Sequence, residues 1–371
     1  GASVGNYALF AGGYGSSPTY KNTVDAYDIS LTRSTPTALS VGRYDLAGAS
    51  VGNYALFAGG YSGNGERSTV DAYNASLVRS TPTTLSVARY ALTGASVGNY
   101  ALFAGGCGFS PTYKDTVDAY NASLVRSTPT ALSEARRWLA GASVGNYALF
   151  AGVYGSSPYY KDTVDAYDAS LVRSTPTTLS VARYALTGAS VGNYALFAGG
   201  CGFSPTYKDT VDAYNASLVR STPTALSEAR RWLAGASVGN YALFAGGVTT
   251  GVIYSTVDAY NASLVRSTPT ALSVARHDLA GASVGNYALF AGGYGSSPNY
   301  KNTVDAYNTD LVRSTPTALS TARFNLAGAS VGNYALFAGG GSGGSSYWNT
   351  VDAYASPVGE AILIQRSHSR V

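Results

Sequence analysis

Gly-Ala-Ser-Val-Gly-Asn-Tyr-Ala-Leu-Phe-Ala-Gly, residues 1–12, decides the fold, because the same twelve residues recur along the whole 371-residue chain. The copies begin at Gly1, Gly48, Gly94, Gly141, Gly188, Gly235, Gly281 and Gly328, so successive starts lie 46 or 47 residues apart. A period of this length, full of strand signals and without helical periodicity, predicts a radial array of small sheets.

Each unit has room for four strands. They fall in Gly-Ala-Ser-Val-Gly, in Asn-Tyr-Ala-Leu-Phe-Ala-Gly, in Thr-Val-Asp-Ala-Tyr and in Leu-Val-Arg-Ser-Thr-Pro-Thr. The second strand is apolar on both faces, as expected for a sheet between two neighbours, and the proline suits an outer edge. We therefore predict an all-β fold: a single-domain, eight-bladed β-propeller of four-stranded antiparallel blades.

The repeat boundaries set the expected blades within the domain 1–371. These are 1–47, 48–93, 94–140, 141–187, 188–234, 235–280, 281–327 and 328–371. The last unit is rewritten after Tyr354 but keeps its length. Seven blades with a partial unit is the alternative architecture.

The composition argues against several kinds of partner. The formal net charge is +4 and Lys and Arg form no cluster, so nucleic acid is not expected. No apolar run approaches the roughly 18 residues of a membrane span, so membrane insertion is not expected. Cys107 and Cys201 are two repeats apart, and the two histidines, His277 and His368, are distant, so neither a disulfide nor a metal site is predicted.

One Asp in Val-Asp-Ala-Tyr and one late Arg occur in every unit, as Asp118 and Arg136 do in the third. Catalysis by carboxylates needs one or two groups in distinct surroundings, which equivalent copies do not offer. We expect these residues to form structural ion pairs or loop-bracing hydrogen bonds. The sequence thus predicts no catalytic residue, no cofactor and no enzyme activity.

The repeat resembles the kelch family. The resemblance rests on Phe10-Ala11-Gly12-Gly13, a variable loop to Thr23, Val24-Asp25-Ala26-Tyr27 and the late Arg43. Two features depart from the family: Leu-Val-Arg-Ser stands where kelch units usually carry an outer-strand Trp, and Val153 replaces a glycine of the pair in unit four. Near-identical units are similar to the highly repetitive kelch-like proteins of bacteria and phages. That resemblance implies an extracellular, cell-surface or phage-tail location.

Differences between the units concentrate in two places, the loop after the Gly pair and the two residues after the late Arg. In a four-stranded antiparallel meander both places emerge at the same end, so they should form one aromatic-rich face. Rigid aromatic anchors among small polar residues are typical of binding surfaces. The candidate ligand-binding residues are Tyr20, Phe109, Tyr113, Trp138, Tyr160, Phe203, Tyr207, Trp232, His277, Tyr300 and Trp348.

We therefore expect a monomeric, non-enzymatic binding module that recognises a protein or a surface glycan, of the adhesin or receptor-binding type. A structural or assembly scaffold without a specific ligand is the alternative. Asn-Ala-Ser occurs at Asn74, Asn121, Asn215 and Asn261. We interpret each asparagine as part of a tight turn, with glycosylation as the other interpretation.

Overall fold

The computed structural model describes residues 37–324 with short gaps, at 38, 44, 63, 75, 77, 110–111, 157–158, 204–205, 285, 320–321 and 323. Outside this range it describes the backbone of the strands given below. Throughout the described part the regular structure is β-strand and no helix occurs. It accordingly holds no helix long and apolar enough to cross a membrane.

The third unit shows the plan of one sheet, which we call a blade. Its strands are β11 (Thr93–Val97), β12 (Tyr100–Ala104), β13 (Val117–Asn121) and β14 (Arg126–Ser127). They pair in sequence order and antiparallel, so β12 lies between β11 and β13. The predicted order is therefore present, but the fourth strand has only two residues because pairing stops before Thr-Pro-Thr.

The other units repeat this plan. Blade one has β1 (Ala2–Val4), β2 (Tyr7–Tyr14), β3 (Tyr20–Tyr27) and β4 (Arg33–Ser34); blade two has β5 (Ala47–Val51), β6 (Tyr54–Ala58), β9 (Val70–Asn74) and β10 (Arg79–Ser80). Blade four has β16 (Ala140–Val144), β17 (Tyr147–Gly155), β18 (Tyr160–Asp168) and β19 (Arg173–Ser174); blade five has β20 (Thr187–Val191), β21 (Tyr194–Ala198), β22 (Val211–Asn215) and β23 (Arg220–Ser221).

The remaining units follow suit. Blade six has β24 (Ala234–Val238), β25 (Tyr241–Ala245), β28 (Val257–Asn261) and β29 (Arg266–Ser267); blade seven has β30 (Ala280–Val284), β31 (Tyr287–Ala291), β32 (Val304–Asn308) and β33 (Arg313–Ser314); blade eight has β34 (Ala327–Val331), β35 (Tyr334–Ala338) and β38 (Val351–Ala355). Small hairpins in the loops are β7 (Tyr61–Ser62) with β8 (Gly65–Glu66), β26 (Val248–Thr249) with β27 (Val252–Ile253), and β36 (Gly341–Ser342) with β37 (Ser346–Tyr347).

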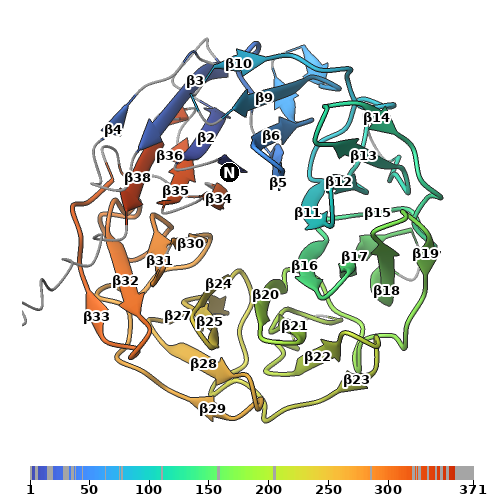
Figure 1. Cartoon of the computed structure of the whole chain (residues 1–371). Coiled ribbons are helices and arrows are strands. Elements are labelled where there is room, and N and C mark those ends of the chain that lie inside the picture. Colours follow the sequence, from blue (N-terminus) through green and yellow to red (C-terminus); the bar gives the residue numbers. More distant parts are fainter. Residues whose placement is uncertain are drawn as a thin grey trace, which may run out of the picture.

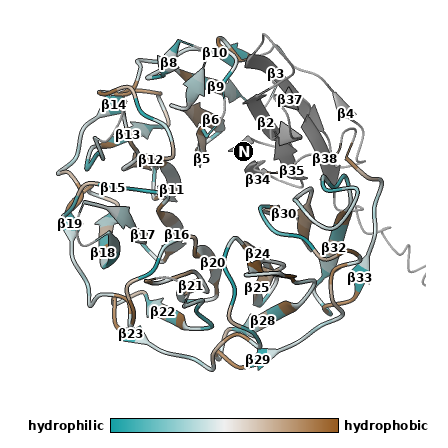
Figure 2. Ribbon diagram, turned by 180° about the vertical axis from the view of Figure 1, so that it is seen from behind, coloured by the Kyte–Doolittle hydropathy of each residue, from teal (hydrophilic) through white to brown (hydrophobic). Residues whose placement is uncertain are grey.

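The sheets are arranged around a common centre, with the first strand of each unit innermost (Figure 1). Seen from behind, hydrophobic segments lie beside the short outer strands β14, β19, β23 and β29 (Figure 2). Repeated four-stranded antiparallel sheets in this arrangement make a repeat β-propeller-like fold.

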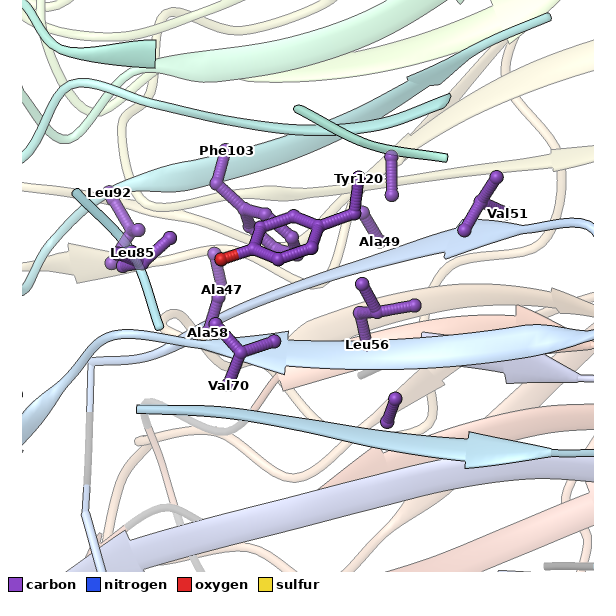
Figure 3. Close-up of a cluster of buried hydrophobic side chains, with 12 residues drawn as sticks. Ala47, Ala49, Val51, Leu56, Ala58, Val70, Leu85, Leu92, Phe103 and Tyr120 are labelled. Carbon is purple, nitrogen blue, oxygen red and sulfur yellow. The ribbon is translucent and has the colours of Figure 1, made fainter. Parts of the chain in front are cut away.

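The core lies between blades. Leu56 and Val70 of blade two pack with Phe103 and Tyr120 of blade three, and Leu85 of the connecting segment completes the cluster (Figure 3). All five side chains are almost fully buried. The doubly apolar second strand follows from this packing, because each blade buries both faces against neighbours.

The inner strands are joined by serines. The hydroxyl of Ser96 donates to the Ser50 carbonyl at 2.7 Å, and that of Ser143 donates to the Ser96 carbonyl at 2.7 Å. The blades approach closely here: a Cβ placed on Gly94 would lie 2.3 Å from the Gly48 carbonyl oxygen. Small residues are therefore required around the axis.

From Arg43 to Arg276, a buried ion pair joins each connecting segment to the next blade. Arg183, which follows blade four, donates from Nη2 to Oδ2 of Asp212 in β22 at 2.7 Å, and both side chains are fully buried. Ser180 donates to the same carboxylate from its backbone N and its hydroxyl. Burial lowers the pKa of Arg183, and the Asp212 charge opposes that effect. The equivalent pairs are Arg43–Asp71, Arg89–Asp118, Arg136–Asp165, Arg230–Asp258 and Arg276–Asp305.

The opposite end of blades two, three, five and six is closed by the Asn-Ala-Ser turn. Oδ1 of Asn121 accepts from the backbone N of Ser123 at 2.9 Å and of Val125 at 3.0 Å. This is the tight turn expected from the sequence. Leu124 has a φ of 61°, in the left-handed region, and packs against the core shared by blades two and three. The burial of Leu124 offsets the cost of that conformation.

Replacing Asp212 by Ala is predicted to lower the free energy of unfolding by about 3–5 kcal/mol, because it leaves the buried Arg183 guanidinium without its counter-charge. Urea denaturation measures the change. Asp209→Ala, at an exposed position three residues earlier, is the control and should change the stability by less than about 0.5 kcal/mol. Equal effects of the two substitutions would contradict a structural role for the pair.

Candidate binding face

The two variable places meet between successive units: the residues after the late arginine of one unit contact the loop after the Gly pair of the next. Tyr90, directly after the late arginine of unit two, and Cys107, directly after the Gly pair of unit three, exchange two backbone hydrogen bonds of 3.0 and 2.9 Å. Cys107 also forms a β-bridge with Tyr113 across its own loop. The segment that leaves one blade is thus paired with the variable loop of the next. We call the surface made by these segments the loop face.

A row of left-handed residues lies where the chain enters the inner strands, at the second residue after each late arginine from Arg43 to Arg276. Each of these residues has a φ of 50–57°, in the left-handed region. The backbone N of Trp138 donates to the Ala91 carbonyl at 3.0 Å, and that of Asp278 donates to the Trp232 carbonyl at 3.0 Å. The residues of this row are Asp45, Ala91, Trp138, Ala185, Trp232 and Asp278.

One aromatic cluster is centred on Tyr154. Tyr159 stacks on it at 5.6 Å between centroids, and Tyr113, Trp138 and Tyr184 meet it edge-on at 6.1–6.3 Å. Tyr154 occupies this position because β17 runs through Val153 to Gly155, with a register shift between Ala151 and Val153. The predicted loop over 154–162 is therefore largely a hairpin, with Tyr154 opposite Tyr160.

A second cluster surrounds Tyr294. Its neighbours His277, Tyr300 and Phe324 lie at 5.3–5.9 Å between ring centroids. His277 also stacks on Trp232 at 5.7 Å, so the segment between blades six and seven contacts the segment between blades five and six. Nδ1 of His277 lies 2.8 Å from Oδ2 of Asp278.

Two arginines stack on the tryptophans. The guanidinium carbon of Arg137 lies 4.0 Å from the Trp138 ring centroid, and that of Arg231 lies 3.8 Å from the Trp232 centroid. Each contact joins a cation to an aromatic face and is worth about 0.5–2 kcal/mol. Trp138 is nevertheless 45% exposed and Trp232 37% exposed. The arginines therefore hold the indoles in place without covering them.

A cleft of about 520 Å³ opens on the loop face between blades four and five. Tyr160 of blade four and Phe203 of blade five both line the cleft, and their rings contact each other edge to face with centroids 6.3 Å apart. Phe203 is 80% exposed. The other lining residues are Tyr159, Val181, Ala182, Gly202, Thr206 and Lys208.

Most of the predicted residues thus lie on the loop face. Phe109 is 79% exposed at the tip of its loop, and Tyr207 reaches blade six, where its hydroxyl lies 2.7 Å from Oγ1 of Thr250. Trp348 and the side chain of Tyr20 lie outside the described residues. The predicted residues that make ring or hydrogen-bond contacts on the loop face are Tyr113, Trp138, Tyr160, Tyr207, Trp232, His277 and Tyr300.

The prediction missed the residues that hold the clusters together. Tyr294 directly follows the Gly pair, Tyr154 holds the same position after Gly152-Val153, and Arg137 and Arg231 directly follow the late arginine. The signal was present in the sequence, because both positions vary between units. Their pairing across blades, such as Arg137 opposite Tyr154, is visible only in the structure.

The described part of the chain has no group of three His, Cys, Asp or Glu side chains that could hold a metal ion. Cys107 and Cys201 are buried free thiols. The Cys107 thiol accepts from Nη1 of Arg137 at 3.8 Å, and its contact with Tyr90 contributes most to raising the pKa of that phenol to about 12.

Asp45 gives the face a pH dependence. Burial raises the pKa of Asp45 to about 6; Arg137 opposes the rise and Asp278 adds to it. The Asp45 carboxyl therefore keeps its proton to a higher pH in the folded state than in the unfolded state. As a result, the free energy of unfolding falls as pH rises from about 4 to 6. Asp45→Asn should raise the unfolding free energy at pH 7 by about 1–2 kcal/mol and flatten its decline over this window. Thermal unfolding between pH 4 and 7 measures both; an unchanged pH profile would contradict the assignment.

No protein-family model matches the chain, and no curated protein sequence matches it. Among solved structures, that of YjhT matches with a TM-score of 0.58 and 11% sequence identity, over 75% of this chain and 98% of YjhT. In all, 571 chains of known structure match. Likeness at this identity shows the fold alone, a repeat β-propeller-like architecture, and the function has to be argued from the loop face.

Proposed function

We propose that the chain is a non-enzymatic recognition module that binds a protein or a surface glycan through its loop face, as an adhesin or receptor-binding domain does. The observation that carries this is the gathering of exposed aromatic side chains at one end of a rigid scaffold. Trp138, Trp232, Tyr159, Phe109 and Phe203 are 37–80% exposed there. Exposed aromatic rings held by contacts at their base are suited to act as anchors in an interface.

The scaffold we infer is an eight-bladed, kelch-type propeller closed into a ring. Contacts of β1 with β34, β2 with β35 and β3 with β38 support closure between the first and last units. The late arginine of each unit and the tyrosine of Val-Asp-Ala-Tyr, both of the kelch pattern, support the family assignment: Arg89 pairs with Asp118, and the Tyr120 hydroxyl donates to the Thr83 carbonyl at 2.8 Å. Closure would protect strand edges from association, which suits a monomer at a cell or particle surface.

A scaffold without a specific ligand is the second candidate, and one observation favours it. Six equivalent valines, each 59–61% exposed, lie beside the outer strands at the end opposite the loop face: Val78, Val125, Val172, Val219, Val265 and Val312. A regular apolar set of this kind would suit contacts in an assembly.

The two candidates are separated by paired variants. The double variant Trp138→Ala/Trp232→Ala is expected to weaken binding to glycan arrays and cell-surface extracts by at least tenfold, because it removes an exposed anchor from each of two identical units. Val125→Ser/Val219→Ser, in the same two units but at the opposite end, should leave that binding unchanged. Surface plasmon resonance measures binding, and thermal unfolding checks that each variant folds.

The converse result would overturn the proposal. If the tryptophan variant binds as the parent does while the valine variant changes the sedimentation coefficient of an assembly, the chain is a scaffold.

A further inference from the structure

We propose that the cleft between blades four and five binds a saccharide ring that carries a negatively charged substituent. The inference deepens the proposed recognition function and rests on it. The cleft holds about 520 Å³ and has eight lining residues, which is the scale of a small ligand. A protein partner would need a contact of about 800 Å² on this surface. The dimensions therefore favour a short oligosaccharide over a protein surface.

The wall from blade four consists of two tyrosines held from behind. Tyr160 stacks on Tyr184 at 5.2 Å with an angle of 18° between the rings, and Tyr159 stacks on Tyr154 at 5.6 Å and 17°. Each tyrosine thus has one face covered by a partner, while Tyr159 remains 52% exposed. Flat rings fixed in this way favour stacking of a saccharide, since little side-chain entropy is lost on binding.

The wall from blade five is Phe203. Its ring touches Tyr160 only edge-on and is 80% exposed. Covering such a ring contributes about 1.5–3 kcal/mol. A pyranose whose apolar face lies against Phe203 would cover this exposed ring.

The polar end of the cleft carries a positive charge. No ion-pair partner of Lys208 is found among the described residues, whereas Lys161 of blade four pairs with Glu134 at 2.7 Å. Unit four has Val181 at the position that Glu134 occupies in unit three, so the equivalent carboxylate is missing. A Cβ placed on Gly202 would lie 3.0 Å from Cε of Lys208, so the lysine stem lies directly over this glycine. A carboxylate or sulfate on the saccharide would supply the counter-charge.

The chain contains its own control. Units three and five are identical from Gly94 to Ala140 and from Gly188 to Ala234, so Phe109 and Lys114 repeat Phe203 and Lys208. The two phenylalanines are 79% and 80% exposed. Blade two, however, presents the hairpin β7–β8 where blade four presents Tyr159 and Tyr160. A substitution in unit five tests the cleft, and the same substitution in unit three tests the loop alone.

The experiment uses the full chain and immobilised oligosaccharides in matched pairs, with and without one uronic carboxylate or sulfate. We expect binding to acidic members, a loss of at least tenfold with Phe203→Ala and less than twofold with Phe109→Ala. Lys208→Gln should lower the affinity for the acidic member of each pair to that for the neutral member, and Lys114→Gln should not. Both phenylalanines are exposed, so thermal unfolding should be unchanged.

Three results would overturn the inference: binding to no acidic saccharide, equal effects of Phe203→Ala and Phe109→Ala, or no preference for the charged member of a pair. If the chain binds no acidic saccharide but captures a protein in a way that depends on Trp138 and Trp232, the recognition function is supported and only the saccharide proposal is wrong. Absence of both kinds of binding would instead count against the recognition function itself.

Discussion

The buried pair between a linker arginine and the aspartate of the following blade is the interaction on which the structure depends. It joins a segment that leaves one sheet to the third strand of the next, in a place without water, where a lone charge would be costly. Arg183 and Asp212 show the contacts of such a pair. Ser180 donates twice to the carboxylate, and Nη2 of Arg183 donates to the carboxylate and to the Phe197 carbonyl, while its buried Nε has no hydrogen-bond partner. Loss of one partner from a unit would leave the other as an unpaired buried charge. The invariance of both residues along the chain follows from this.

The same constraint decides where the chain can vary. Residues that face another blade, such as Phe103 and Tyr120, are buried on all sides, and the inner glycines touch the neighbouring backbone. The loops after the Gly pair and the residues after the late arginine escape these contacts. Because the meander returns both to one end, most of the variation collects on one surface. A repetitive framework thus carries a face that differs from blade to blade.

The variable positions on this face are paired across blades. Where Cys107 or Cys201 follows the Gly pair, the residue opposite is a tyrosine, Tyr90 or Tyr184. Where Tyr154 stands there instead, the opposite residue is Arg137, whose guanidinium lies 5.4 Å from the tyrosine ring centroid. The two variable positions therefore act as a pair, and a change in one blade alters the surroundings of a residue in the next.

Much of this organisation was readable from the sequence, because the repeat period, the doubly apolar strand and the glycines each report a local requirement. The strand order and the common end of the variable segments were predicted on that basis. The hub role of Tyr154 and the walls of the cleft could not be, since they depend on contacts between residues of different blades. The two-residue outer strand was also missed: Arg126 and Ser127 pair with β13, but the following Thr-Pro-Thr turns toward the next blade, where the Thr130 carbonyl accepts from the Tyr167 hydroxyl.

Hydrogen–deuterium exchange of the full chain, with and without the oligosaccharide that binds best on the array, tests the central claim most directly. If the loop face is the recognition surface, bound ligand will slow exchange at the amides around 154–160 and 201–208 and leave the turns at 121–125 and 215–219 unchanged. Slower exchange confined to those turns, at the end opposite the loop face, would contradict the account.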